Sequence, residues 1–232
     1  MLPAVAWLEW NGILYWASYQ RAFFEPRSAV SHLIEGIWER FPGSAHFMLR
    51  SRIFTTSEPT ELCRGMVIVC AKRMSRVAKI PDEVAERMAR GTAALDLSAC
   101  VRDASAHLTS IAAGVPPVKA ERDRSIESWL ISAEGRLLGW AVNTSGRNRT
   151  QHAEMNLLRA WWMREGRPLP LGSRVVTTLE PCPMCAGALW ECAASRDDFE
   201  VHYQHPDHGS VVSRSVLRNT PLLQQCPISE HS

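Results

Sequence analysis

Two short segments dominate this sequence: His152-Ala153-Glu154 and, about thirty residues later, Pro181-Cys182-Pro183-Met184-Cys185. Together they supply one imidazole, two thiols and one carboxylate. A catalytic zinc site keeps three protein ligands and leaves its fourth position to water. His152, Cys182 and Cys185 meet that need, because the spacing of the cysteines lets one turn of chain bring both sulfur atoms to one metal. The pattern predicts a zinc centre, with Zn²⁺ as cofactor.

Glu154 lies two residues after His152, near the predicted metal but not needed as a fourth ligand. Zinc lowers the pKa of its water towards neutrality, which makes hydroxide available for attack on a substrate. A carboxylate beside that water can take its proton and return it to the substrate. We therefore predict that Glu154 is the catalytic proton shuttle. For the cysteine motif alone, a redox pair or a closed structural zinc site is the alternative, the latter with Cys192 or His202 as fourth ligand. A structural site has no use for Glu154.

The stretch from Thr177 to Leu189, T-T-L-E-P-C-P-M-C-A-G-A-L, resembles the second zinc motif of the cytidine deaminase-like superfamily. It is similar in particular to the branch that contains bacterial tRNA adenosine deaminases and guanine deaminases. The resemblance covers roughly residues 125–210 and is specific for the superfamily, not for a substrate. It implies a three-layer α/β/α fold around a mixed five-stranded sheet, with each zinc motif at a helix N-terminus. By position it assigns zinc binding and proton transfer to the same four residues.

The resemblance also bears on substrate contacts. Asn143 corresponds to an asparagine that contacts the substrate base in that family, and we expect Asn143, Ala153 and Pro181 to contact the substrate. Arg147 and Arg149 lie between Asn143 and His152. If the implied fold is right, these two arginines flank the mouth of the site and could hold a phosphate. An ordinary solvated loop is an equally good interpretation of the pair.

Local patterns agree with an α/β fold. Apolar runs over residues 128–132 and 136–142 flank a turn and predict a hairpin. Apolar residues recur at helical spacing from Ala153 until Gly166. The segment 174–179 is a candidate buried strand that leads into the cysteine motif, and residues 199–203 are a further strand candidate. Such alternation of strands and helices favours a sheet covered by helices on both faces.

The first part of the chain repeats this pattern in degraded form. Residues 52–65 align without a gap with the segment that starts at Arg174, and residues 7–17 mirror the hairpin. At the motif positions, Ser28 falls on His152, Val30 on Glu154, Thr60 on Cys182 and Cys63 on Cys185. One thiolate cannot hold a catalytic zinc. We therefore predict two tandem copies that form a pseudo-dimer within one chain: a degenerate, metal-free domain over residues 1–92 and a catalytic zinc deaminase domain over residues 93–232.

Two other segments carry weaker signals. Residues 82–114 have a helical pattern with a break at Gly91, and their second part, about Asp96 to Ala113, is a candidate for the first helix of the catalytic domain. Residues past about 215 show no clear pattern, so we expect a mobile tail there.

Bulk composition is less informative. The chain has 232 residues, a formal net charge of +2 and 46% apolar residues, which fits a globular protein without the strongly basic footprint of a dedicated nucleic-acid binder. Seven cysteines, two of them assigned to metal, do not suggest a disulfide framework. We find no signal-peptide pattern and no apolar stretch of membrane-spanning length, so we expect a cytoplasmic protein without a membrane partner.

These observations favour a zinc-dependent hydrolytic deaminase of adenine or cytosine in RNA or DNA, with tRNA or a single strand as the partner. A deaminase of a free nucleobase or nucleoside, such as guanine, cytosine or cytidine, is the first alternative. A non-catalytic, zinc-stabilised nucleic-acid-binding module and the effector domain of a secreted toxin are alternatives from other classes. The pattern leaves open whether the pseudo-dimer also forms a homodimer.

Overall fold

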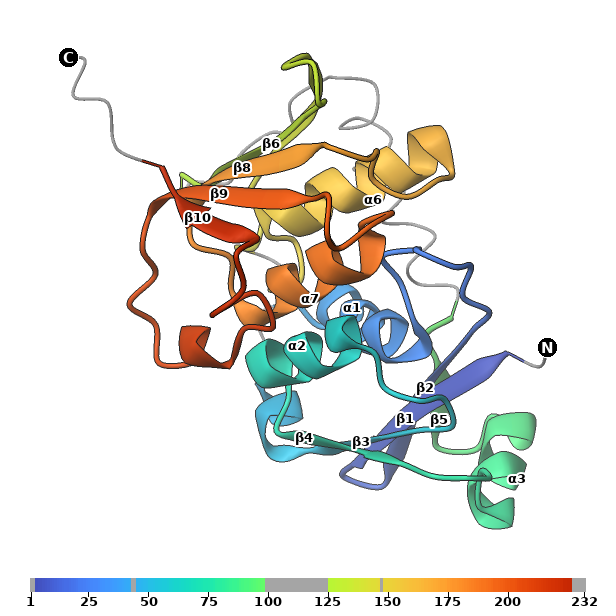
Figure 1. Cartoon of the computed structure of the whole chain (residues 1–232). Coiled ribbons are helices and arrows are strands. Elements are labelled where there is room, and N and C mark those ends of the chain that lie inside the picture. Colours follow the sequence, from blue (N-terminus) through green and yellow to red (C-terminus); the bar gives the residue numbers. More distant parts are fainter. Residues whose placement is uncertain (1–2, 43–44, 99–124, 147, 227–232) are drawn as a thin grey trace.

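The computed structural model describes residues 3–42, 45–98, 125–146 and 148–226, which form two mixed five-stranded sheets with helices (Figure 1). The α/β class and the five-stranded mixed sheet predicted from the sequence are confirmed. The first sheet has the strand order β4-β3-β1-β2-β5 and the second has the order β10-β9-β8-β6-β7. The strands are β1 Ala4–Trp10, β2 Ile13–Tyr19, β3 Arg52–Thr55, β4 Arg73–Arg76, β5 Ala94–Asp96, β6 Glu127–Ile131, β7 Leu137–Val142, β8 Arg174–Leu179, β9 Glu200–His205 and β10 Leu223–Gln225.

The main helices lie between the two sheets, as Figure 1 shows. Helix α1 packs on β1 and β2, α6 packs on β6 and β7, and α2 and α7 pack against each other. We refer to residues 3–98 as the first half and to residues 125–226 as the second half. The helices are α1 Ala29–Arg40, α2 Glu61–Cys70, α3 Asp82–Arg90, α6 Ala153–Glu165 and α7 Pro183–Cys192, with short 3-10 helices at Ala45–Arg50 and Val212–Arg214.

Local capping chemistry explains where these helices begin and end. The Ser28 hydroxyl accepts a hydrogen bond from the Ser31 amide, and the Ser31 hydroxyl accepts one from the Ser28 amide, so α1 starts with a capping box. Thr60 caps α2 through its hydroxyl. Helix α6 ends at Gly166, which has a φ of 62° that residues with a Cβ rarely adopt.

The two halves share one apolar core. Ile37 and Met66 of the first half and Leu130 and Leu189 of the second are all fully buried and belong to one continuous cluster. Burial of apolar side chains is the dominant favourable contribution to folding, so each half depends on the other for part of its stability.

Four strands have the same arrangement in both halves. The order β4-β3-β1-β2 matches β9-β8-β6-β7. In each half the first pair of this order, β4 with β3 or β9 with β8, is parallel. The other two pairs are antiparallel in both halves. Even the register agrees, because Trp7 lies opposite Trp16 in the first half and Trp129 lies opposite Trp140 in the second. The fifth strand differs: β5 runs parallel to β2 at one edge, whereas β10 runs parallel to β9 at the opposite edge.

Strand β5 lies beyond residue 92, the predicted end of the first domain, and pairs with β2 of the first sheet. The segment after residue 215 is not a featureless tail over its described part, because β10 pairs with β9 and Leu217 is fully buried. The candidate helix from Asp96 to Ala113 falls almost entirely outside the described residues. No helix within the described ranges is long and apolar enough to cross a bilayer.

Candidate metal centre and its pocket

Two helix N-termini bring the predicted metal ligands together. His152 is the N-cap of α6 and Cys182 is the N-cap of α7, both with extended backbone, and Cys185 lies in the first turn of α7. Pro183 occupies the first position of α7, where its fixed φ and missing N–H suit a helix start. A helix N-terminus carries a partial positive charge that stabilises thiolates. The backbone therefore favours the ionised cysteines that a metal requires.

The distances among the three side chains fit a tetrahedral zinc ion. The sulfur atoms of Cys182 and Cys185 are 3.7 Å apart, and the Nδ1 atom of His152 lies 3.4 Å from the first and 3.6 Å from the second. Zinc–sulfur bonds of ~2.3 Å and zinc–nitrogen bonds of ~2.0–2.1 Å at tetrahedral angles would separate the ligand atoms by about 3.8 Å and about 3.6 Å. Among the described residues, this is the single group of three such side chains with ligand atoms close enough to hold a metal ion.

Electrostatics around the cluster also favour a thiolate. The hydrogen bond with Cys185, together with the nearby imidazole of His152, holds the pKa of Cys182 well below its usual range in spite of burial. Burial lowers the pKa of His152, but the charge of Cys182, the hydrogen bond with its sulfur and the charge of Glu154 together outweigh burial, and the net pKa is raised. The imidazole and the Cys182 sulfur thus stabilise each other's charged forms.

Glu154 lies beside the cluster without belonging to it. Its side chain is buried in the first turn of α6, with Oε2 3.2 Å from the Cys185 sulfur and Oε1 3.3 Å from the Thr177 hydroxyl. Burial, and after it the charge of Cys182, raises the pKa of Glu154. A carboxyl group with a raised pKa next to a metal site is suited to accept and return a proton near neutral pH.

A cavity of about 880 Å³ opens on this cluster and contains several of the predicted site residues. His152, Glu154, Cys182, Asn143 and Arg149 all line it. Ala153 and Pro181 are buried next to the ligands and are not among the lining residues. Arg147 lies outside the described residues, so its place relative to the cavity stays a prediction.

Further walls of the cavity come from segments outside the two zinc motifs. The segment 206–211 lines it, and Asp207 is held there because its amide donates to Glu180. Ile126 contributes from the start of the second sheet, and Val69 contributes from α2 of the first half. Val69 lies beyond the aligned repeat segment 52–65, and no sequence pattern indicated that it faces the cavity of the second half.

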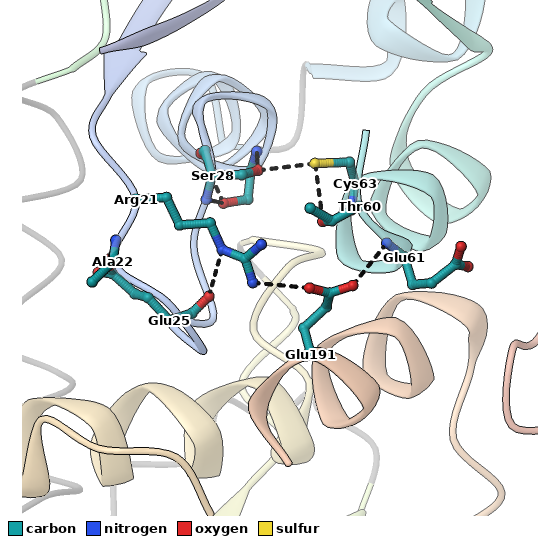
Figure 2. Close-up of polar contacts among 9 residues, drawn as sticks. Arg21, Ala22, Glu25, Ser28, Thr60, Glu61, Cys63 and Glu191 are labelled. Carbon is teal, nitrogen blue, oxygen red and sulfur yellow. Dashed lines mark hydrogen bonds and ion pairs between the residues drawn. The ribbon is translucent and has the colours of Figure 1, made fainter. Parts of the chain in front are cut away.

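The first half has a counterpart to this cluster in which hydroxyl groups replace two of the ligands. Ser28 and Thr60 cap α1 and α2, as His152 and Cys182 cap α6 and α7. The sulfur of Cys63 lies 3.2 Å from the Ser28 hydroxyl and 3.4 Å from the Thr60 hydroxyl (Figure 2). A single sulfur with two neutral hydroxyls is a poor zinc donor set, so these side chains satisfy one another by hydrogen bonding instead.

An ion pair between the halves lies next to that counterpart cluster. Glu191 of α7 accepts hydrogen bonds from the guanidinium of Arg21 and from the backbone amide of Glu61, each at 3.2 Å, as Figure 2 shows. Glu61 is the first residue of α2, where the positive end of the helix favours a carboxylate. Glu191 and Val69 are both eight residues beyond the starts of their helices. One of the two equivalent positions therefore lines the metal cavity and the other bridges the halves.

Comparisons with known proteins agree with this site. Residues 117–226 match the family model of Bd3614-like deaminases. This part of the chain is a Bd3614-like deaminase domain of the cytidine deaminase-like kind.

Two curated relatives are both named tRNA(Ile)-lysidine synthase. The one from Deinococcus deserti is 44% identical over 64 residues and the one from Deinococcus radiodurans is 41% identical over 64 residues. Each alignment covers 27% of this chain, and the chain spans only 12% and 11% of the length of these relatives. A solved structure from a study of A-to-I editing by tRNA:A34 deaminases at the wobble position of transfer RNA matches with a TM-score of 0.34 and 23% identity, covering 44% of this chain and 82% of that one.

Proposed function

We propose that this chain is a zinc-dependent hydrolytic deaminase that acts on a nucleobase carried in RNA or DNA. Residues 117–226 would form the catalytic domain, and the first half would be its degenerate, metal-free partner. The observation that carries the proposal is the position of Glu154, whose buried carboxylate lies 3.2 Å from a sulfur of a three-ligand cluster with tetrahedral spacing. A zinc site that served folding alone would not need a buried carboxylate there.

His152, Cys182 and Cys185 would hold the metal, which when bound supplies a Lewis acid that makes water a usable nucleophile near neutral pH. Glu154 would take one proton from that water and deliver it to the ring nitrogen of the base. It would then pass the second proton to the exocyclic amine, which leaves as ammonia while a carbonyl replaces it on the ring. One water is consumed and one ammonia is released, so no oxidant or second substrate is needed.

The volume of the cavity supports a substrate larger than a free base. A volume of about 880 Å³ lies near the upper end of the usual range of small-molecule sites, about 300–1,000 Å³. Asn143 lines the cavity and would hydrogen-bond the base. Ala153 and Pro181 are buried next to the metal ligands, and they would act on the base only through those neighbours. Arg149 at the cavity, with Arg147 beside it in sequence, would contact a phosphate of the polynucleotide. The names of the two relatives, which refer to tRNA, also support RNA as substrate.

Two observations favour a free nucleobase or nucleoside as a second candidate substrate. The guanidinium of Arg149 lies 5.9 Å from the ring centre of Trp38, which already satisfies part of its charge. The net charge of +2 is also small for a protein that binds a polyanion.

A comparison of three proteins tests the proposal: wild type, Glu154→Gln and Cys182→Ser. Each would be analysed for zinc content and for ammonia release from guanine, adenosine, cytidine, deoxycytidine monophosphate, tRNA and single-stranded DNA. We expect about one zinc per chain in the wild type and in Glu154→Gln, and little in Cys182→Ser. Turnover should fall by about 10²–10⁴-fold in Glu154→Gln, the usual contribution of a general acid–base group. Unchanged turnover in that variant, or a wild type without zinc, would overturn the proposal.

Salt dependence separates the two substrate classes. Binding of tRNA or single-stranded DNA should weaken steeply as salt rises, because phosphate contacts release counterions. Salt-insensitive turnover of a free base would favour the second candidate. If the wild type contains zinc but turns over none of these substrates, a non-catalytic zinc-stabilised module would be favoured instead.

A further inference from the structure

Helix α6, which begins at His152, is tied to the first half by a buried ion pair. Arg159 of α6 contacts Glu35 of α1 through Nη2 and Oε1, and the two side chains are only 4% and 6% exposed. The other terminal nitrogen of Arg159, Nη1, donates to the backbone carbonyl of Thr150 at 3.4 Å. Arg159 therefore joins the first half to the segment that leads into the metal ligand.

Glu35 and Arg159 occupy equivalent positions in the two halves. Each lies seven residues after the residue that caps its helix, Ser28 in α1 and His152 in α6. The contact therefore joins a position to its own counterpart. In a symmetric pair of identical domains the same contact would bring two like charges together in a buried site, which is strongly unfavourable. The pair is compatible with two halves only if their sequences have diverged at this position.

This ion pair is a costly way to join two helices. Taking both charges out of water carries a penalty of several kcal/mol per ion, and apolar side chains of similar size often replace such pairs without loss of stability. Burial lowers the pKa of Arg159 even though Glu35 opposes the shift. The Nε atom of Arg159 is buried without a hydrogen-bond partner. Stability alone does not account for this buried pair. The planar guanidinium of Arg159 does, because it holds Glu35 and the Thr150 carbonyl in fixed directions.

The segment that Arg159 holds is also the wall of the cavity. Asn148 lies 3.5 Å from Glu39 of α1, and Arg149 lies over Trp38 of the same helix. Arg149 lines the cavity and His152 is the first metal ligand. Helix α1 thus contacts the segment directly at Asn148 and Arg149, and its ion pair with Arg159 adds a buried contact from within α6.

We propose that Glu35 and Arg159 are positioning residues, through which the metal-free half holds the segment 148–152 in the geometry that metal and substrate require. The inference deepens the proposed function, on which its kinetic part rests. It also assigns the helix face around Glu35 and Arg159 to contact within one chain, so that copies of the chain do not pair through it.

The test replaces the pair by apolar side chains in the full-length protein, as Glu35→Leu with Arg159→Met. The matched control makes the same exchange at an exposed ion pair of the first half, Glu58→Leu with Arg76→Met, whose side chains are 69% and 58% exposed. We expect both double variants to fold. Transfer of zinc to a chromogenic chelator should be about 10–100-fold faster in the buried-pair variant, the usual effect of losing a residue that orients a metal ligand, and unchanged in the control. KM should rise more than kcat falls.

Two further measurements keep the outcome clear. Hydrogen exchange of the amides of residues 148–156 needs neither zinc nor activity, and it should speed up at least tenfold in the buried-pair variant but not in the control. The charge exchange Glu35→Arg with Arg159→Glu should restore docking of the halves, yet leave fast zinc transfer, because arginine would no longer reach Thr150. Wild-type exchange rates and zinc transfer in a folded buried-pair variant would overturn this inference while leaving the deaminase proposal intact. A wild type without zinc would overturn the deaminase proposal. The hydrogen-exchange data would still decide whether Glu35 and Arg159 position the segment.

Discussion

Gly65 of α2 and Gly187 of α7 face each other's helices where these two helices pack together. A Cβ on Gly65 would lie 2.0 Å from the carbonyl oxygen of Pro183, and one on Gly187 would lie 2.3 Å from the carbonyl oxygen of Glu61. The spacing between Gly65 and Gly187 along the chain equals that between Glu61 and Pro183. The contact is therefore reciprocal, as in a two-fold interface between identical subunits, but it lies within one chain.

We expect Gly65→Ala to push α7 away from α2, because the added methyl group meets backbone that cannot rotate aside. Overpacking of this kind costs about 1–3 kcal/mol of unfolding free energy. Since α7 carries Cys182 at its start, zinc should also transfer faster to a chelator. Urea unfolding and chelator competition would measure the two effects.

Gly139→Ala is the control for that variant. A Cβ on Gly139 of β7 would lie 3.4 Å from the Leu157 side chain, an ordinary contact. We expect the unfolding free energy to stay the same or to rise by less than about 1 kcal/mol. Equal losses of unfolding free energy in Gly65→Ala and Gly139→Ala would contradict the close backbone contact between α2 and α7.

The equivalence of the two clusters predicts that a second metal site can be restored. In the double variant Ser28→His and Thr60→Cys, the first half would present an imidazole and, with Cys63, two thiols at the same helix positions as the second half. Zinc per chain, measured by atomic emission, should rise from about one to about two. Thr60→Cys alone provides the control, because two thiols without the imidazole should not hold the metal tightly. A stoichiometry that stays near one in the double variant would show that the two helix N-termini do not meet as they do in the second half.

Val69→Glu should weaken binding of a polynucleotide while leaving the metal in place. The change puts on α2 the side chain that Glu191 has at the equivalent position of α7, and directs it to the cavity wall. A carboxylate there would repel phosphates, so KM for tRNA or single-stranded DNA should rise about tenfold at low salt and less at high salt. Val69→Thr has a similar shape and no charge, and it should behave much more like the wild type. An unchanged KM in Val69→Glu would mean that the substrate does not reach this wall.

Alkaline pH should destabilise the protein partly through Cys70. Burial raises the pKa of the Cys70 thiol from 9.0 to about 12. Below pH ~9 both folded and unfolded chains keep this proton, and the group has no effect. Between pH ~9 and ~12 only the unfolded chain loses it, so the unfolding free energy falls with pH by up to about 1.4 kcal/mol per unit from this group.

The variant Cys70→Ala should therefore show a shallower decline in urea unfolding free energy between pH ~8.5 and ~10.5 than the wild type. Cys226→Ser changes a cysteine that is partly exposed, and it serves as the control. Parallel pH profiles of wild type and Cys70→Ala would contradict the protonation argument.

Short-range patterns allowed much of the site to be predicted. Both hairpins, the strand before the cysteine motif and the glycine that ends α6 follow from the alternation of apolar residues and from local φ preferences. His152, Cys182 and Cys185 meet as expected, because two helix starts place their caps side by side. The degenerate motif around Cys63 was also visible, since it differs from the intact motif at few positions.

Patterns of this kind failed where a segment's structure depends on a distant partner. The stretch around β10 has no alternation of its own and is a strand because β9 offers a free edge. The same holds for β5, which extends the first sheet past residue 92 by pairing with β2. Strands of three residues are too short to leave a periodic signal.

The sequence by itself thus determined the His-Cys-Cys cluster, the carboxylate of Glu154 beside it and the repeat, because each depends on residue types at short spacing. Only the tertiary structure decided that Glu35 pairs with Arg159 and that Val69 of one half lines the cavity of the other. Both features join residues that are far apart in the sequence, and they exist because the helices of both halves pack face to face between the two sheets. No local pattern encodes that docking, since it depends on the shapes of two folded surfaces.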